Sequence, residues 1–494
     1  MKNAILRIAR RINYPILAAI SLVAYLAASQ FLYGMGFPLD DAWIHQTYAR
    51  NLGLLGEWAY LAGEPSAGST APLWSGLLAI GHYLRLGPYL WTYFLGWVFL
   101  SAVVMLGINL VRKMEPNNEK WGGIAGILLV FEWHLVWAAT SGMETTLFTS
   151  MVLVVFALIL AKTRRWFFLG GITGLSIYAR PDGLTLIGPV VMVLILEKTG
   201  WRRKLYRGLE FLAGFGLLFG PYLLANSALS GSYWPNTFYA KQAEYSIELL
   251  DPLWRRLFEQ FGLPLVGVGV VLLPGFIYFL YQAVLRKSWE RLGICIWAIG
   301  YLIMFALRLP VTYQHGRYAI PMMPAYFICG LIGTLSSIRL NSPNLYRRVV
   351  SRSLVIAGGM VLFSFWFLGA RAFARDVAII ESEMVNTARW VAANIERNSV
   401  IAAHDIGALG YFTQHRLVDL AGLVSPEIIP FIRDEERLAE YLDEQKVDYL
   451  VTFPGWYPLL VKKAIPVFRT NALYAPQQGG ENMGVYQWGH IAIP

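Results

Sequence analysis

Two adjacent aspartates, Asp40 and Asp41, follow the first long apolar run, Tyr14–Gly36, and lie in a polar segment, Phe37–Ser69. A carboxylate beside a like charge and near an apolar boundary binds its proton more tightly than usual. Such a group suits a general base that takes a proton from a hydroxyl nucleophile, and a pair can also hold a divalent cation through its oxygens. A plainer interpretation, compatible with the first, is that Asp41 caps a helix that continues to Leu54.

A helix that starts at this pair places further polar side chains one turn or more away. His45 shares a helix face with Asp41, so it can orient an aspartate or contact a phosphate; a plain polar role at a membrane interface is the alternative. Arg50 can reach a phosphate, or it can extend toward the interface and pair with an acid such as Glu57. Both residues are candidates for binding substrate.

Further charged side chains stand in short loops between later apolar runs. Glu144 begins a helix, where a negative charge also favours the helix dipole. Arg180 precedes a Pro-Asp-Gly turn that does not need it. Several cations and a pair of carboxylates would together hold an anionic lipid phosphate beside a base. The candidate cations are Arg180, Lys241, His315 and Arg317.

His404 and Asp405 follow a short apolar run of strand length in the C-terminal part of the chain. Polar residues at strand ends often line a crevice, so substrate contact and a plain structural role both stay open. The sequence contains no glycine-rich dinucleotide loop after a strand and no P-loop lysine motif. It also lacks the serine elbow of the hydrolases. A nucleotide-sugar donor is therefore not supported.

The composition is that of a polytopic membrane protein. The chain is 56% hydrophobic and 15% charged, whereas a soluble protein has about 25% charged residues. Its net charge of +10 comes from basic clusters in short loops, such as Arg7–Arg11 and Lys162–Arg165. That is the positive-inside pattern, so no nucleic-acid partner is indicated. Cys295 and Cys329 lie in apolar runs, which excludes a disulfide framework.

Eleven crossings are expected, with the N-terminus in the cytoplasm and residues 37–69 as the first external loop. The apolar run Pro72–Leu86 is short, so it is interpreted as a partial or juxtamembrane helix, with a twelfth span as the alternative. The expected spans are Tyr14–Gly36, Pro88–Val111, Trp121–Ala139, Thr145–Ala161, Trp166–Ala179, Gly183–Leu196, Gly208–Ser227, Leu263–Leu285, Leu292–Leu309, Gly316–Ser337 and Leu354–Phe373.

The tail after residue 373 has the pattern of a small soluble α/β domain outside the cytoplasm. Asp376–Arg397 has helical periodicity, and three short apolar runs have strand length: Ser399–Ala403, Arg416–Asp419 and Val447–Thr452. Two domains follow, a membrane domain (1–373) and an extracytoplasmic domain (374–494).

A set of short motifs resembles the GT-C membrane glycosyltransferases, and within them the branch that contains cell-wall arabinofuranosyltransferases. The motifs occur in order over most of the chain: Asp-Asp-Ala-Trp-Ile (40–44), Tyr-Ala-Arg-Asn (48–51), Gly-Ser-Thr-Ala-Pro-Leu-Trp (68–74), Ser-Gly-Met-Glu-Thr (141–145), Arg-Pro-Asp-Gly (180–183), Pro-Asn-Thr-Phe-Tyr-Ala-Lys (235–241), His-Asp-Ile-Gly-Ala-Leu-Gly-Tyr-Phe (404–412) and Asp-Leu-Ala-Gly-Leu (419–423).

The resemblance implies an inverting transfer of a hexose or pentose from a polyprenyl-phosphate donor at the external face of the plasma membrane. The acceptor would be a glycan, lipid or protein of the cell envelope, and a divalent metal stays open. An acidic residue of the first external loop acts as base in this family, which corresponds to Asp40 or Asp41; Asp40 leads the motif. The alternatives are a transporter or flippase, which would place ionisable groups at the bilayer midplane, and a non-catalytic scaffold.

Overall fold

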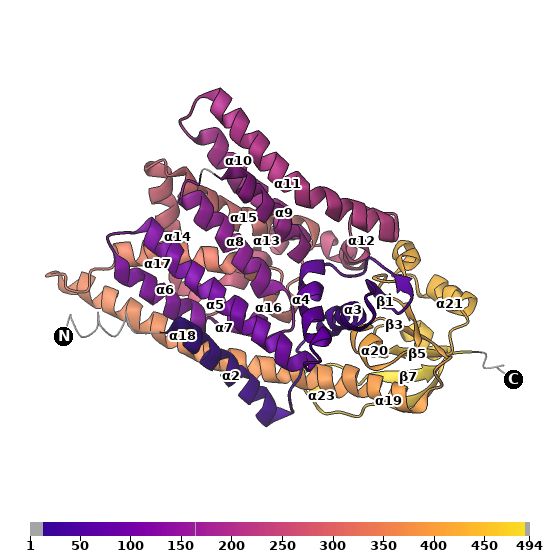
Figure 1. Ribbon diagram of the computed structural model, residues 1–494. Coiled ribbons are helices and arrows are strands. Elements are labelled where there is room, and N and C mark those ends of the chain that lie inside the picture. Colours follow the sequence, from indigo (N-terminus) through magenta and orange to yellow (C-terminus); the bar gives the residue numbers. More distant parts are fainter. Residues whose placement is uncertain (1–12, 164, 490–494) are drawn as a thin grey trace.

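The computed structural model describes residues 13–163 and 165–489. The predicted basic residues Arg7–Arg11 and Arg164 lie outside the described residues. Most of the chain forms a bundle of helices, and a smaller region with a β-sheet lies at one end of the bundle (Figure 1). We call residues 386–489 the C-terminal region.

The described chain contains seven helices that are long and apolar enough to cross a membrane, in agreement with the predicted polytopic membrane fold. Each corresponds to one of the predicted spans. They are α2 (Tyr14–Leu32), α5 (Pro88–Met114), α11 (Trp201–Ser230), α14 (Val268–Leu285), α15 (Trp289–Arg308), the stretch Tyr313–Ser337 that ends in α17 (Met323–Ser337), and the stretch Leu345–Asn394 that begins with α18 (Leu345–Ile380).

One predicted span is bent. The run Trp121–Ala139 forms α6 (Glu119–Phe131) and α7 (Trp133–Thr140), which meet at 53° and make an eighth candidate span when counted together. Glu132 lies between the two helices. Its carboxylate accepts a hydrogen bond from the backbone N–H of Leu135 at 3.1 Å and thereby caps α7.

Three further predicted spans form shorter apolar helices, with 10–17 residues each. They are α8 (Thr145–Leu160), α9 (Trp166–Ala179), and the pair η1 (Pro181–Leu186) and α10 (Ile187–Leu196). All eleven predicted runs are therefore helical, and the number that crosses the membrane stays a prediction. The run interpreted as a partial helix forms α4 (Pro72–Tyr83), whose 12 residues are fewer than the roughly 20 that a crossing needs.

Small residues allow close helix contacts within the bundle. A Cβ added to Gly170 of α9 would lie 2.0 Å from the carbonyl oxygen of Phe211 on α11. One added to Gly214 of α11 would lie 1.9 Å from the carbonyl oxygen of Phe167. Glycine is required at both positions because the two backbones approach this closely.

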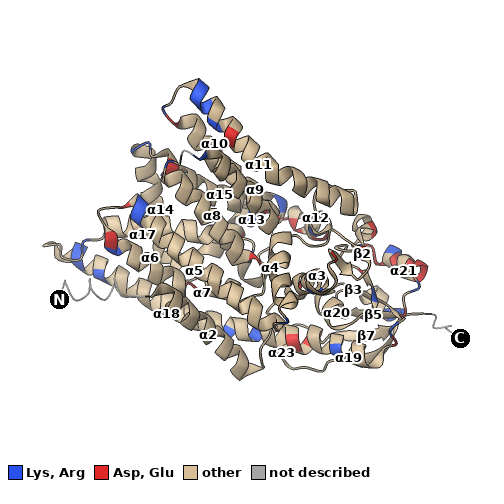
Figure 2. Ribbon diagram, viewed as in Figure 1, with Lys and Arg blue, Asp and Glu red and all other residues tan. Residues whose placement is uncertain are grey.

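The helices that connect the longer ones are short. They are α12 (Asn236–Glu244), η2 (Tyr245–Leu250), α13 (Leu253–Gly262), η3 (Leu263–Leu265), α16 (Tyr313–Gly316) and η4 (Ile320–Met322). Lys and Arg gather at the start of α11 and of α18, at the end of the bundle away from the C-terminal region, whereas the middle of the bundle carries few charges (Figure 2).

The C-terminal region contains a five-stranded sheet in the order β4-β3-β5-β7-β6. The three predicted strands are confirmed as β3 (Val400–Ala403), β4 (Arg416–Asp419) and β5 (Tyr449–Thr452), with β3 parallel to both neighbours. The antiparallel strands β6 (Ile465–Arg469) and β7 (Gly484–Gln487) were not predicted. β6, with the sequence Ile-Pro-Val-Phe-Arg, lies at the edge of the sheet and is largely exposed. The sheet is accompanied by α20 (Gly407–Phe412), η6 (Pro426–Phe431), α21 (Glu435–Glu444), α22 (Pro458–Lys462) and α23 (Tyr474–Gln477).

The chain enters the C-terminal region without a break in its helical conformation. Helix α18 runs through the expected boundary after residue 373 and continues through the π-helical turn η5 (Glu381–Val385) into α19 (Asn386–Asn394). Inside η5, the carboxylate of Glu383 accepts a hydrogen bond from the backbone N–H of Met483 at 2.8 Å. The division at residue 373 stays a prediction.

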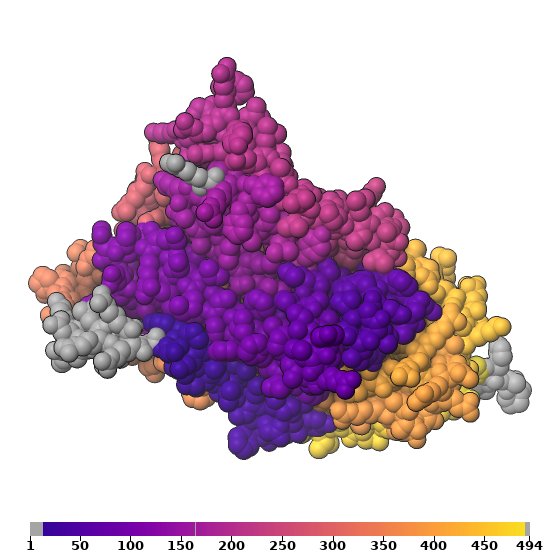
Figure 3. Space-filling model, viewed as in Figure 1, coloured from indigo at the N-terminus to yellow at the C-terminus, as the bar shows by residue number. Residues whose placement is uncertain are grey.

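The first polar segment fills the space between the bundle and the C-terminal region. It forms α3 (Asp41–Leu55) and a two-stranded ribbon of β1 (Ala59–Leu61) and β2 (Glu64–Pro65). Figure 3 shows the purple surface of this part of the chain against the orange surface of the C-terminal region, and α3 packs on α20. Helix α3 therefore brings the N-terminal part of the chain into contact with the C-terminal region.

Candidate active site

Helix α3 begins at Asp41, with Asp40 directly before it. The helix was predicted, but the predicted side-chain cap is wrong: among the described residues neither aspartate makes a capping hydrogen bond within α3. Their carboxylates are instead directed to partners from other parts of the fold, and these partners differ.

Asp40 is buried and connects α3 to the C-terminal region. Its carboxylate accepts hydrogen bonds from the backbone N–H groups of Gly407 at 2.7 Å and Ala408 at 2.8 Å, at the start of α20. Burial first, and then the charge of Asp405, raises the pKa of Asp40 to about 8, although both N–H donors oppose this shift. The two N–H donors occupy both carboxylate oxygens of Asp40.

Asp41 is 30% exposed and lies opposite two cations. Its carboxylate is 2.6 Å from Nη2 of Arg317 and 3.6 Å from Nζ of Lys241. Burial alone would raise the pKa of Asp41, but Arg317 and Lys241 outweigh it and hold this pKa well below its usual range. The side chain is thus an ionised carboxylate beside a small cationic cluster.

Tyr318 organises that cluster. Its hydroxyl accepts hydrogen bonds from Lys241 at 2.9 Å and from Arg317 at 3.1 Å. Three cations lie 5.0–5.5 Å from the centre of its ring, namely Arg180, Lys241 and Arg317, within the range of cation–π attraction. The ring and the hydroxyl together hold at one place Arg180 from the end of α9, Lys241 from α12 and Arg317 from the end of α16.

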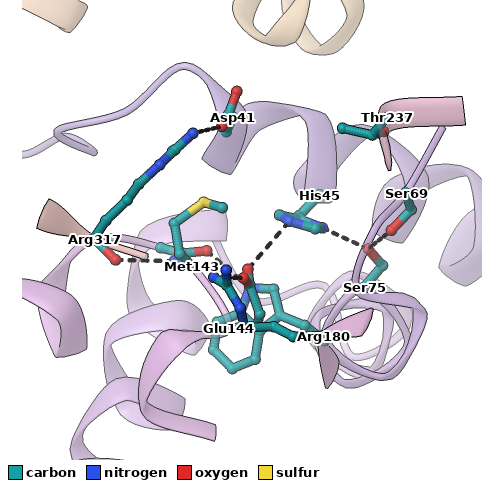
Figure 4. Close-up of polar contacts among 12 residues, drawn as sticks. Asp41, His45, Ser69, Ser75, Met143, Glu144, Arg180, Thr237 and Arg317 are labelled. Atoms are coloured by element: carbon teal, nitrogen blue, oxygen red, sulfur yellow. Dashed lines mark hydrogen bonds and ion pairs between the residues drawn. The ribbon is translucent and has the colours of Figure 1, made fainter. Parts of the chain in front are cut away.

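Arg180 is neutralised by two carboxylates. Its Nη1 lies 3.0 Å from Glu144 and its Nη2 lies 2.8 Å from Asp182. His45, one turn beyond Asp41 on α3, connects to this network because its Nε2 lies 3.5 Å from Glu144 and its Nδ1 lies 3.0 Å from the hydroxyl of Ser75. Figure 4 shows this polar chain running from α3 to Arg180.

Lys241 and Arg317 have less counter-charge than Arg180. Both face the same carboxylate, that of Asp41. Arg317 is 7% exposed, and its Nε and Nη1 have no hydrogen-bond partner within residues 13–163 and 165–489. Buried N–H groups without partners are costly in free energy, so this arrangement is suited to receiving an anion.

An apolar cavity of about 430 Å³ opens on one side of Asp41 and reaches into the helical bundle. Its polar members include groups described above, such as His45, Glu144 and Arg180, together with Arg308, Gln242 and several threonines. Most of the remaining wall is apolar: Met143, Leu184, Trp234, Phe238, Met304, Phe305 and Leu309.

A second cavity, of about 670 Å³, lies on the side of the C-terminal region and is lined mainly by polar side chains. Asp41, Lys241 and Arg317 line both cavities. The other polar and aromatic members of this wall are Asp40, Glu244, Tyr245, Glu248, Tyr313, Gln314, His404, Asp405, Arg433, Glu435, Trp456 and Tyr457.

His404 is held by two carboxylates in the polar cavity. Its Nε2 lies 3.1 Å from Glu244 and its Nδ1 lies 3.5 Å from Asp405. Burial would lower the pKa of His404, but Tyr457 and these carboxylates outweigh burial and raise it well above its usual value. The ring also makes an edge contact with Trp456, with ring centres 4.9 Å apart.

Two predicted substrate-binding residues lie outside the lining of both cavities. His315 pairs with Asp376 of α18 at 2.8 Å. Arg50 donates to the backbone carbonyl of Tyr411 at 2.6 Å and thereby joins α3 to α20. The predicted pair of Arg50 with Glu57 is replaced by this contact, because Glu57 accepts a hydrogen bond from the backbone N–H of Gly63; the phosphate contact stays a prediction.

No group of three or more His, Cys, Asp or Glu side chains is arranged to hold a metal ion in the described part of the chain. Asp182, Glu244, Tyr318 and Trp456 are among the residues of the site that were not predicted. Asp182 lies two positions after Arg180 and Tyr318 lies directly after Arg317, so each is close in sequence to a predicted cation.

A family model described as a domain of unknown function (DUF8728) matches residues 375–486. No curated protein matches the chain. The family match covers the C-terminal region together with the end of α18.

Solved structures match nearly the whole chain. ArnT from Cupriavidus metallidurans matches with a TM-score of 0.60 and 15% identity, over 95% of this chain and 97% of that one. The Archaeoglobus fulgidus oligosaccharyltransferase matches with a TM-score of 0.60 and 11% identity, over 98% of this chain and 75% of that one. The chain has the GT-C fold. The mycobacterial arabinofuranosyltransferase AftD is similar over 97% of this chain and 40% of that one, with a TM-score of 0.50 and 16% identity.

Two structures with the GT-C fold were solved with lipid phosphates. One ArnT structure contains undecaprenyl phosphate. One structure of the A. fulgidus enzyme contains a dolichol-phosphate and an inhibitory peptide. At 11–16% identity, these similarities show the fold of this chain, and its chemistry has to be argued from its own site.

Proposed function

We propose that this protein is an integral-membrane glycosyltransferase that moves a sugar from a polyprenyl-phosphate donor to an acceptor hydroxyl or amide, with inversion at the anomeric carbon. The GT-C fold and the cationic cluster support this proposal together. The observation that carries it is the place of Asp41, whose carboxylate lies where an apolar and a polar cavity meet, beside Arg317 and Lys241.

Each cavity suits one substrate in this proposal. The apolar cavity, with walls such as Trp234 and Phe305, accepts the first part of a polyprenyl chain and places its phosphate at the cations. The polar cavity, with His404 and Trp456 in its wall, receives the acceptor. The two substrates then meet at Asp41.

We assign the base to Asp41 because its carboxylate is accessible from both cavities. Asp40 led the motif, but both of its oxygens accept backbone hydrogen bonds from α20. For a hydroxyl acceptor, the proton passes to Asp41 as the oxygen forms a bond to the anomeric carbon. The bond from that carbon to the phosphate oxygen breaks, and its electron pair leaves with the phosphate. Arg317 and Lys241 stabilise the charge that develops there.

The cellular setting is part of the proposal. We infer a plasma-membrane protein with a cytoplasmic N-terminus, because basic residues gather at the end of the bundle away from the site (Figure 2). The C-terminal region and the site would then face outward, where the acceptor is a glycan, lipid or protein of the envelope. The donor sugar is a hexose or a pentose.

A transfer assay tests the function. The full-length protein in nanodiscs is incubated with a panel of polyprenyl-phosphate sugars and envelope fractions, and transfer is followed by radiolabel. We expect Asp41→Asn to lower transfer by about 10² to 10⁴-fold, the size of a general-base effect, while folded Asp40→Asn keeps transfer within about tenfold of wild type. Full transfer by Asp41→Asn would show that Asp41 is not the base. Movement of an unmodified lipid-linked sugar across the bilayer, without transfer, would favour a flippase.

A further inference from the structure

The cationic cluster lacks one anion. Lys241 and Arg317 share the single carboxylate of Asp41, whereas Arg180 has Glu144 and Asp182 to itself. Low exposure makes this imbalance costly, because charges interact strongly away from bulk water.

The unpartnered N–H groups point to where that anion binds. Nη2 of Arg317 is occupied by Asp41 and Tyr318, while Nε and Nη1 have no partner among the residues that the structure describes. The N–H of Nε lies on the same edge of the guanidinium as Nη2, so a phosphate that takes the place of Asp41 can bind side by side through Nη2 and Nε, or through Nη2 and Nη1. Arg317 lines the apolar cavity, so a phosphate at its mouth can reach these donors.

Tyr318 allows the cations to change partner without moving far. Lys241 and Arg317 each donate to its hydroxyl, at 2.9 Å and 3.1 Å. These bonds do not involve Asp41, so they persist when Asp41 is displaced. Asp41 is 30% exposed, and its separated carboxylate would remain in contact with water in the polar cavity.

We propose that the donor phosphate competes with Asp41 for Arg317 and Lys241, so that binding of the lipid-linked donor releases Asp41 to act as the base. The inference rests on the proposed function, since it identifies the missing anion as the phosphate of the donor. It adds an order of events: donor first, then proton removal from the acceptor. A carboxylate that is paired with two cations is a weak base, and the same carboxylate freed from them is a stronger one.

The same exchange describes how the site returns to its resting state after transfer. A phosphodiester donor carries one negative charge, whereas the phosphate monoester left after transfer carries about −1.5 to −2 at neutral pH. The monoester therefore holds both cations while the new bond forms. Asp41 passes the proton that it has taken to water in the polar cavity, and when the monoester dissociates the ionised carboxylate pairs again with Arg317 and Lys241, which restores the resting arrangement.

Binding of undecaprenyl phosphate to the full-length protein in nanodiscs tests the exchange without any need for transfer. Asp41→Asn removes the competing charge, so we expect its affinity for undecaprenyl phosphate to rise about tenfold over wild type. Asp405→Asn is the matched control, because Asp405 is a carboxylate of the polar cavity that pairs with His404. We expect its affinity to stay within about twofold of wild type. Asp41→Ser repeats the measurement with a smaller side chain, and thermal melting shows that each variant is folded.

Each possible outcome of this binding experiment either supports or overturns the exchange. Tighter binding by both Asp41 variants and unchanged binding by Asp405→Asn support the exchange. Binding by folded Asp41 variants that is equal to or weaker than wild type overturns it, and so does an equal gain in Asp405→Asn, which would show a general effect of charge. If wild type itself does not bind undecaprenyl phosphate, the proposed donor class is wrong, and that failure is distinct from a failure of the exchange alone.

Discussion

The carboxylate of Asp40 accepts a 2.7 Å hydrogen bond from the backbone N–H of Gly407, a residue 367 positions later in the chain. With the second bond from Ala408, it attaches the start of α3 to the start of α20. The position of Asp41 therefore depends on how the C-terminal region is docked. A Cβ on Gly407 would lie 2.1 Å from the carbonyl oxygen of Asp40, so this contact requires glycine.

Asp40→Ala should loosen that docking. The substitution removes two hydrogen bonds and leaves two buried N–H groups without a partner, at a cost of about 1–3 kcal/mol for each unpaired group. We expect a lower melting temperature of the full-length protein and faster proteolysis of the C-terminal region. Gly34→Ala, at a site with nothing within 4 Å of the added Cβ, is the control. A stable Asp40→Ala protein would contradict the structural role.

The same carboxyl predicts a pH dependence of stability. Burial raises the pKa of Asp40 to about 8 in the folded protein, whereas an aspartate in an unfolded chain has a pKa near about 3.9. The folded state thus binds the proton more tightly, so this contribution is fully present below about pH 4 and is lost as the pH rises toward 8. Melting of wild type and Asp40→Asn between pH 5 and about 9 measures it. The difference between the two proteins should shrink with rising pH, and a constant difference would refute the prediction.

Tyr318→Phe should weaken donor binding while keeping the ring. The variant loses the hydroxyl that Lys241 and Arg317 share, so the cations are less well positioned for a phosphate. We expect KM for the lipid-linked donor to rise about tenfold, the loss of roughly one charged hydrogen bond. Tyr326→Phe is a matched control, since its hydroxyl donates to the backbone of Gly269 on α14. Equal KM values of the two variants would show that the Tyr318 hydroxyl does not contribute to donor binding.

The sequence predicted those parts of the fold and site that depend on local patterns. Apolar runs predicted the eleven helical segments, and α3 was expected as a helix capped by Asp41, although that cap is wrong. The bend at Glu132 was missed because one acid inside an apolar run does not reveal that it caps a new helix. Strand β7 was missed because its four residues are ordered by pairing with β5 and β6.

In the site, residue type marked the charged groups but not their partners. Arg180, Lys241 and Arg317 were found because cations outside the basic clusters are unusual. Tyr318 was missed because it is one of 27 tyrosines, many of which suit a membrane interface. The different roles of Asp40 and Asp41 arise from α20 and α16, which are distant in sequence. Such long-range contacts follow from tertiary packing, and no local pattern encodes them.

Trp456→Ala tests which cavity receives the acceptor. Trp456 is 49% exposed in the wall of the polar cavity, so its removal should leave the fold intact while it removes a broad apolar contact surface. We expect KM for the acceptor to rise about tenfold, the value of one aromatic contact, with no change in KM for the lipid-linked donor. Trp254→Ala is the control, because Trp254 is 71% exposed on α13 and lines neither cavity among the described residues. If KM for the lipid-linked donor rises instead, the donor binds in the polar cavity and the roles of the two cavities are exchanged.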